Sequence, residues 1–325
     1  MQFHLDYKPI ISAQQMSHQQ GVLLIGSCFS EHIHSKLNSL KFTTETNPFG
    51  IVFNPKSIAI SLNRILIKNY YTINDVFEKD GLWFCFEAHT SIFEQTQLEL
   101  VNILNATINS WHEKLKKAQW LVITVGSAYA YKHINLQQTV SNCHKLPNST
   151  FEKQLMSSSD IVSDYSTLIE NLKQLNPELQ VMLTVSPVKH LRDGMIENSL
   201  SKAILIQAVH QLVSRNRNCH YFPAYELVTD DLRDYRFYKA DMAHPNGMAI
   251  DYVWQKFEEV YFSDDTKLIN LKFADVHSAF HHKPLNKKTE AFVKFKSTYY
   301  KKCEALKAQY PWADLSTELM YFKIV

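Results

Sequence analysis

The sequence predicts an α/β fold in which helices cover both faces of a parallel sheet. Three short apolar runs, at residues 22–25, 120–125 and 180–185, are typical of strands that are buried on both faces. A stretch with helical spacing follows each run, and strands that alternate with helices in this way form parallel sheets. Functional sites in such sheets gather at the carboxyl ends of the strands.

The elements of the first half follow from the spacing of apolar residues and from turn residues. Residues 42–46 favour a strand, and the turn Asn47-Pro48-Phe49-Gly50 ends it. In chain order we expect a helix over 31–40, this strand, a helix over 56–67, a hairpin made from 82–86 and 91–93, and a helix over 97–118.

The second half repeats the alternation up to residue 262. We expect a helix over 151–175, a strand over 180–185, a helix over 199–215, a short strand over 220–222 and a helix over 247–262. Beyond this point the chain becomes rich in lysine and aromatic residues. We therefore expect a catalytic domain over 1–262 and a helical, aromatic extension over 263–325 that packs on it and that is a candidate for dimerisation.

Composition indicates an ordinary globular protein that is not adapted to nucleic acid or to an anionic membrane. Of its 325 residues, 45% are hydrophobic and 20% are charged, and the formal net charge is only +2. Its five cysteines are odd in number and widely spaced, which favours free thiols in a reducing compartment. No secretory signal and no membrane-spanning run is visible, so we expect a cytoplasmic protein.

Two short segments far apart in the sequence suggest a catalytic site. Ser27 and Cys28 follow the first strand, at a strand-to-helix turn where free backbone N–H groups can stabilise an oxyanion. His244, with Asp241 three residues before it, supplies a general base and a group that orients it. Alternatively, the first segment is a helix N-cap with a buried cysteine, and the second is a capped helix start.

These segments, with several others, resemble the GSCFA domain family. The family motif appears as Gly26-Ser27-Cys28-Phe29-Ser30, with Ser30 in place of alanine. Further matching segments are 47–50, 142–145, 184–190 and 231–238. The resemblance covers about residues 15–262 and implies a branch of the SGNH (GDSL-like) hydrolases. It thus implies a three-layer α/β/α, flavodoxin-like fold and acyl-ester chemistry.

The resemblance leaves two candidate nucleophiles. Cys28 occupies the place of the serine in the Gly-Asp-Ser motif, so a literal reading makes it the nucleophile, activated as a thiolate by His244. A shift of one residue makes Ser27 the nucleophile and leaves Cys28 as a small buried residue. In both readings His244 is the base and Asp241 holds its ring.

The oxyanion hole departs from the family pattern. Gly50 is a candidate donor of a backbone N–H, although it also suits an ordinary turn. The SGNH motif Gly-x-Asn-Asp is replaced by a segment that begins Gly126-Ser127, so the asparagine is missing. Ser127 or Asn142 is expected to replace it, and the departure also fits a degenerate site.

Basic residues are expected to shape the substrate pocket, without any metal or cofactor. Candidates for substrate binding are Lys189, His190, Arg233, Arg236 and His144. Guanidinium groups suit a carboxylate or phosphate, while the alternative is a structural network of ion pairs. No histidine has metal-ligand spacing with another histidine or with a cysteine.

The sequence therefore predicts an esterase or acyltransferase that forms a covalent acyl-enzyme and acts on a small or carbohydrate-linked ester. The alternative is a catalytically degenerate module that binds an acylated or anionic glycan-type ligand.

Overall fold

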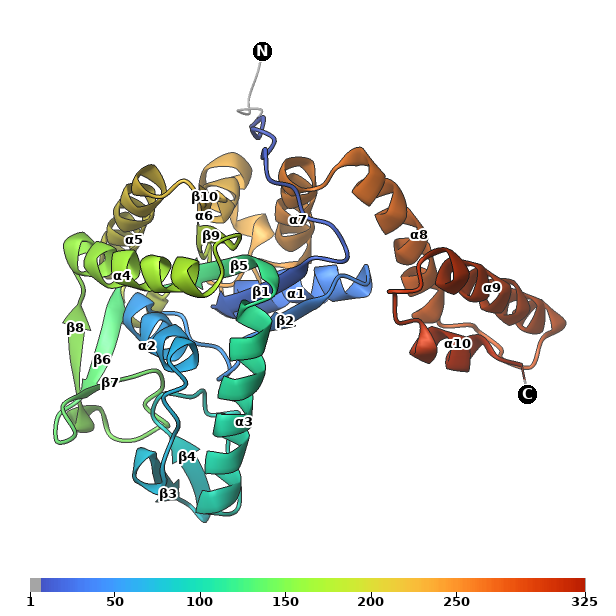
Figure 1. Ribbon diagram of the computed structural model, residues 1–325. Helices are drawn as coiled ribbons and strands as arrows, with labels where there is room; N and C mark the ends of the chain where they lie inside the picture. Colours follow the sequence, from blue (N-terminus) through green and yellow to red (C-terminus); the bar gives the residue numbers. More distant parts are fainter. Residues whose placement is uncertain (1–6, 325) are drawn as a thin grey trace.

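A five-stranded parallel sheet lies at the centre of the computed structural model, which describes residues 7–324 (Figure 1). From edge to edge the strands are β10 (Cys219–Tyr221), β9 (Gln180–Val185), β5 (Ala118–Val125), β1 (Gly21–Gly26) and β2 (Thr44–Thr46). Counted along the chain within this sheet, the order is 2-1-3-4-5, the doubly wound arrangement with a switch point between β1 and β5. The predicted fold class is confirmed.

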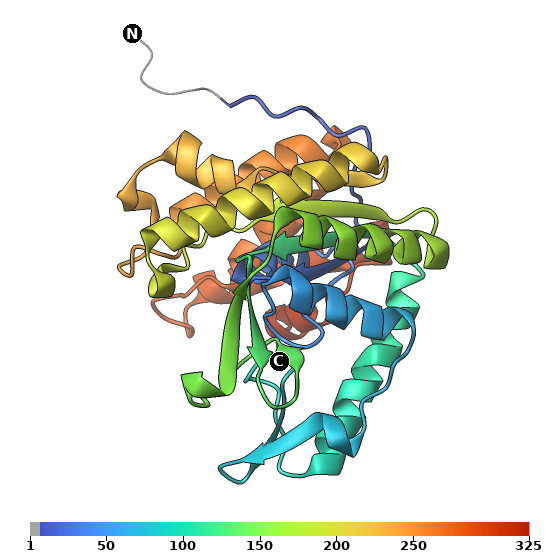
Figure 2. The ribbon, with the colours of Figure 1, turned by 90° about the vertical axis from the view of Figure 1, so that its left-hand side faces the viewer.

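Alternate side chains of the strands enter two separate hydrophobic cores. Val22 and Leu24 of β1 pack on one face of the sheet, whereas Leu23 and Ile25 pack on the other. In the first core lie α1 (Cys28–Ser39) and α7 (Gly247–Tyr261), and in the second lie α2 (Pro55–Leu66), α3 (Gln97–Leu115), α4 (Ser158–Leu175) and α5 (Met195–Arg215). Figures 1 and 2 show these helices on both faces of the sheet.

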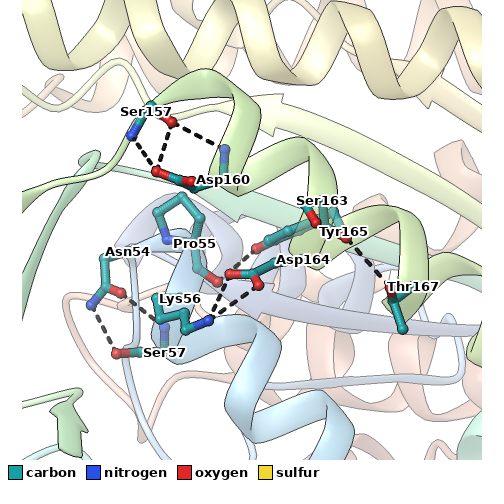
Figure 3. Close-up of polar contacts among 10 residues, drawn as sticks. All are labelled: Asn54, Pro55, Lys56, Ser57, Ser157, Asp160, Ser163, Asp164, Tyr165 and Thr167. Carbon is teal, nitrogen blue, oxygen red and sulfur yellow. Dashed lines mark hydrogen bonds and ion pairs between the residues drawn. The ribbon is translucent and has the colours of Figure 1, made fainter.

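Polar contacts join α2 to α4 on one side of the molecule (Figure 3). The Lys56 ammonium lies 2.9 Å from a carboxylate oxygen of Asp164, and the hydroxyl of buried Tyr165 donates to the Pro55 carbonyl at 3.2 Å. Ser157 begins α4 as its N-cap, in a capping box that satisfies the first free N–H groups of the helix. The two helices are thus fixed to each other above the second core.

The expected hairpin has a different partner strand. β4 (Leu82–Cys85) pairs antiparallel with the preceding segment β3 (Val76–Lys79), through a two-residue turn at Asp80 and Gly81. Both turn residues have positive φ, as a type I′ hairpin turn requires. The hairpin expected from 82–86 and 91–93 is reduced to one isolated antiparallel bridge between Trp83 and Glu94, because an Asp-Gly turn on the other side of the strand selects the main partner.

The helix expected over 151–175 begins late. Residues Phe151–Leu155 form β8, which pairs antiparallel with β6 (Tyr129–His133), and β7 (Gln138–Val140) completes a small separate sheet. The helix α4 starts only at Ser158, because the capping box at Ser157 sets its first turn. Long-range pairing with β6 therefore overrides the local helical pattern.

Within residues 263–324 the chain forms three helices, namely α8 (Asp264–Phe280), α9 (Glu290–Gln309) and α10 (Ser316–Phe322). Phe273 and Phe322 belong to the core that also holds Phe42, and the His18 ring stacks on Phe42 at 4.1 Å between centroids. The boundary at residue 262 stays a prediction. Over residues 7–324, no helix has both the length and the apolar character that a membrane crossing needs.

Candidate active site

The turn between β1 and α1 can be built only with glycine at position 26. Gly26 has a φ of +139°, and a Cβ at this position would lie 2.1 Å from the Thr124 carbonyl oxygen of the neighbouring strand. Ser27 follows as the N-cap of α1, and its Oγ accepts a hydrogen bond from the Phe29 N–H at 3.3 Å. Cys28 is consequently the first residue of the helix, at the carboxyl edge of the sheet and at its switch point.

The Asn47-Pro48-Phe49-Gly50 segment holds this turn in place. Asn47 Oδ1 accepts from the Gly26 N–H at 2.9 Å, and the Asn47 N–H donates to the Leu24 carbonyl at 2.9 Å. The Gly50 N–H itself donates to the Asn47 carbonyl at 2.9 Å, and a Cβ on Gly50 would lie 2.5 Å from that of His89. Gly50 thus allows a close approach to His89, and its N–H is already engaged within the turn.

Cys28 and His244 line the same narrow pocket. The pocket has a volume of about 10 Å³, and Val188 and Pro245 also line it together with His32 from the next turn of α1. The thiol is half-buried, and among the described residues no hydrogen bond joins it to the His244 ring. Catalytic hydrogen bonds are often loose in a site without substrate. The fold therefore brings together two segments that lie more than two hundred residues apart.

The resting thiol of Cys28 is protonated at neutral pH. Burial raises the pKa of Cys28 above its ordinary value, and the nearby Glu31 carboxylate raises it further. Lys239 and the backbone N–H groups of Cys28 and Phe29 act in the opposite direction but do not reverse the shift. Activation of Cys28 consequently requires a base, and the thiol is not held as a permanent thiolate.

This pKa shift predicts slow alkylation of Cys28 at neutral pH. Because the thiolate is the reactive form, the rate with iodoacetamide should be below that of a free cysteine at pH 7 and should still be rising above pH 9. The measurement is site-resolved mass spectrometry across the pH range, with Cys28→Ala to identify the modified peptide. A rate that is already maximal at pH 7 would show instead a stabilised thiolate.

Asp241 orients the His244 ring. Its Oδ2 lies 2.7 Å from His244 Nδ1, while its Oδ1 accepts from the N–H groups of Ala243 at 2.9 Å and His244 at 3.0 Å. The backbone hydrogen bonds to His244 and Ala243, followed by the bond to the ring, lower the pKa of Asp241 to about 2. The carboxylate is therefore ionised at every pH at which an enzyme of this kind would work, and it leaves Nε2 as the nitrogen for proton transfer.

Backbone pairing fixes the loop that carries His244. The Lys239 N–H donates to the His244 carbonyl at 2.7 Å, and Tyr238 forms an isolated antiparallel bridge with Pro245. The Lys189 N–H donates to the Ala243 carbonyl at 3.0 Å, which ties the loop to the segment after β9. His244 is thus held by a small hairpin and not by a free loop.

Ser127 and Asn142 do not line this pocket, among the residues that the structure describes. Ser127 is buried, and its Oγ accepts from the Tyr129 N–H at 3.2 Å. Asn142 Oδ1 accepts from the Thr90 hydroxyl at 2.9 Å and from the His144 N–H at 2.8 Å. Both side chains are engaged in loop structure, so the oxyanion donors have to be sought at the start of α1.

His144 and His190 have structural surroundings. The His144 ring is 2% exposed, lies 2.9 Å from the Cys85 carbonyl oxygen and packs among phenylalanine rings, and burial lowers its pKa to about 4. The His190 ring packs on Phe53 with centroids 4.8 Å apart. Neither histidine lines the pocket of Cys28 in the described part of the chain.

The predicted basic residues separate into two groups. Lys189 and Arg233 line a second cavity of about 210 Å³. Arg236 is exposed and pairs with the Asp234 carboxylate at 2.9 Å. Arg236 thus matches the alternative of a local ion pair, whereas Lys189 and Arg233 remain candidates for substrate binding.

Lys202 is a buried residue at the carboxyl edge of the sheet that the sequence motifs did not predict. It is 1% exposed, and its Nζ donates to the carbonyls of Gly126 at 2.6 Å and Ser186 at 2.7 Å, which follow β5 and β9. Burial lowers the pKa of Lys202 to about 7. Lys202 lies three residues before Leu205, on the buried side of α5, so the helical spacing in the sequence could have indicated its burial.

A search of curated proteins gave no match. Among solved structures, the chain is similar to a carbohydrate esterase family 3 protein from Talaromyces cellulolyticus, with 10% identity and a TM-score of 0.36 over 79% of this chain and 99% of that chain. This likeness is too distant to support a functional argument. A family model described as the C-terminal domain of GSCFA domain proteins matches residues 273–324. The GSCFA family model matches residues 21–257, more than half of the chain, and the protein therefore belongs to the GSCFA family.

Proposed function

We propose that this protein is an esterase or acyltransferase that carries a small acyl group as a thioester on Cys28. The observation that supports the proposal most directly is the shared pocket of Cys28 and His244, in which Asp241 holds the imidazole at 2.7 Å. A nucleophile, a base and a group that orients the base is the constellation used for acyl transfer on unrelated folds. Its position after the first strand and before the last helix of the sheet domain also follows the SGNH pattern.

In the proposed mechanism, His244 Nε2 takes the proton of the Cys28 thiol while Sγ attacks the acyl carbonyl carbon. The tetrahedral oxyanion forms beside the N-terminus of α1, where the Cys28 N–H and the positive end of the helix stabilise it. Collapse breaks the bond to the alcohol oxygen, and the imidazolium returns its proton to that oxygen. Water or an acceptor alcohol then attacks the thioester, with His244 again as base, and the thiol is restored.

Cys28 is favoured over Ser27 as the nucleophile. Ser27 is 3% exposed, and its Oγ serves as the helix cap by accepting from the Phe29 N–H. Attack by Ser27 would remove that cap from α1, which costs about 1 kcal/mol. Cys28 is only partly buried and lies in the pocket itself.

The size of the pocket favours a short acyl group. A volume of about 10 Å³ is close to that of one water-sized sphere, and Pro187, Val188 and Val253 contribute apolar walls. Any acyl group must displace these walls to enter, and the displacement is smallest for an acetyl group and grows with each further carbon of the chain. We therefore propose acetyl or a similarly short group as the acyl unit.

The proposal predicts a covalent adduct on Cys28. After mixing with p-nitrophenyl acetate, intact-mass spectrometry should detect an added acetyl group in the wild-type protein and in Ser27→Ala, but not in Cys28→Ala. The matched control is Cys143→Ala, which removes another partly buried thiol and should keep the adduct. An adduct lost only in Ser27→Ala would instead establish a serine esterase. The absence of an adduct from the wild-type protein and from every variant would favour the alternative, a module that binds its ligand without catalysis.

A further inference from the structure

A second cavity adjoins the pocket of Cys28 and His244. It has a volume of about 210 Å³ and shares Val228 with that pocket. Lys189 and Arg233 line it, together with Tyr235 and Tyr238. Two cations and two aromatic rings therefore lie beside the candidate nucleophile.

The hairpin that positions His244 also fixes this cavity. Tyr238 lines the cavity and bridges Pro245, which lines the catalytic pocket. The Lys189 side chain lines the cavity, and the Lys189 backbone N–H donates to the Ala243 carbonyl at 3.0 Å. The cavity therefore has a defined position relative to the His244 ring.

The charge lining the cavity is predominantly positive. The Lys189 ammonium lies 4.3 Å from the centroid of the Tyr235 ring and 4.0 Å from that of Tyr238, so aromatic rings and not a carboxylate hold it in place. Asp234 also lines the cavity, but its carboxylate binds Arg236 through both the guanidinium and the backbone N–H. Within residues 7–324, the Arg233 guanidinium forms no ion pair or side-chain hydrogen bond.

The shape of the chain at Arg233 supports a role in binding. Arg233 has a φ of +42° and ends a π-helical turn over Leu227–Leu232, a conformation that costs energy for a residue with a side chain. Tyr235 beside it is 59% exposed, so part of its ring is accessible to a ligand in the cavity. A guanidinium matches a carboxylate or phosphate through paired hydrogen bonds, and an aromatic ring beside it offers an apolar face with a polar tip.

We propose that this cavity binds the anionic alcohol part of the ester, so that the substrate is a short acyl ester of a negatively charged sugar. The assignment rests on the proposed function, because it places the sugar beside the reacting acyl group. Arg233 binds the carboxylate or phosphate, Lys189 adds a second positive charge, and the exposed Tyr235 ring covers one face of the sugar.

The test compares three acetyl esters that differ in charge: acetylated glucose, acetylated glucuronate and acetylated glucose 6-phosphate. In the wild-type protein, kcat/KM should be at least about tenfold higher for an anionic ester than for the neutral ester at low salt, and the difference should shrink at high salt. A higher value for glucuronate indicates a carboxylate ligand, and a higher value for the phosphate ester indicates a phosphate ligand. Equal values for all three esters would overturn the proposal.

Variants test the residues. Lys189→Met and Arg233→Gln should each reduce the ratio of anionic to neutral kcat/KM by about three- to tenfold, since each removes one charge from the site. Lys173→Met is the matched control, because Lys173 is an exposed residue on α4, on the other core of the sheet, and its removal should leave the ratio unchanged. A ratio that is the same in all four proteins would also overturn the assignment.

Binding without turnover separates this proposal from the proposed function. Calorimetric titration with glucuronate, glucose 6-phosphate and glucose should show saturable binding of at least one of the two anions. The affinity for that anion should be lower in Lys189→Met and in Arg233→Gln. An adduct on Cys28 without any preference for anions would support the proposed enzymatic function and overturn the assignment of an anionic sugar. Anion binding without an adduct would support the assignment of the cavity as an anion site and overturn the proposed enzymatic function.

Discussion

Replacing His244 by alanine is expected to lower kcat/KM for a small acetyl ester by about 10³-fold or more. The resting thiol of Cys28 is protonated, because burial raises its pKa, and it therefore needs a base during attack. His244 lies in the same pocket. In the proposed mechanism it takes the proton and later returns it to the leaving alcohol. The variant loses both transfers, so the loss should appear in kcat and not only in KM.

Asp241→Asn separates orientation of the ring from proton transfer. Asparagine keeps the size of the side chain but removes the charge that holds His244 at 2.7 Å, so we expect a fall in kcat of about 10²-fold or more. His282→Ala, a change of an exposed histidine outside the site, is the control and should be close to wild type. Thermal unfolding of each variant checks that the fold is intact. Turnover that survives in His244→Ala would exclude His244 as the base.

Replacing Lys202 by methionine is expected to lower the free energy of unfolding at pH 8.5 by about 2–4 kcal/mol. The Nζ of Lys202 is the hydrogen-bond donor to the carbonyls of Gly126 and Ser186, at 2.6 and 2.7 Å. Methionine fills a similar volume but donates nothing, so two buried acceptors at the edge of the sheet lose their partner. Urea unfolding followed by circular dichroism measures the loss, with Lys173→Met as the control for removal of a lysine.

The same substitution should change the pH dependence of stability. Burial lowers the pKa of Lys202 to about 7, whereas a lysine in the unfolded chain keeps its proton until about pH 10.4. Above pH 7 the unfolded state therefore binds more protons, so the wild-type protein should gain about 1–2 kcal/mol between pH 7 and 8.5 from this group. Lys202→Met should lack this gain. Equal pH dependence in both proteins would mean that Lys202 keeps its ordinary pKa.

Patterns within a single segment predicted the sheet well. The run at 180–185 corresponds to β9 at Gln180–Val185, and the run at 120–125 lies within β5 at Ala118–Val125. Strands that are buried on both faces are apolar at every position, so their signal does not depend on which neighbours they have. Even the strand-to-helix turn at Ser27 was visible, since a glycine and a cap residue are local requirements.

Segments that depend on a distant partner were less predictable. Phe151–Leu155 has a helical pattern yet pairs with β6, and the hairpin of β4 uses the strand before it. Gly50 is required by the close approach of His89, a contact that spans about forty residues and is invisible in the motif itself. Such choices depend on long-range contacts, which outweigh local preferences of a fraction of a kcal/mol per residue.

The sequence by itself determined the doubly wound class, the family and the residue types of the site. Each of these is indicated by the periodicity or the motif of a short segment. Only the tertiary structure decided that Cys28 and His244 share one pocket, that the Ser27 hydroxyl is engaged as a helix cap, and that a buried lysine joins two strand ends beneath the site. Distances between segments arise from how the helices pack on the sheet, and no single segment carries that information.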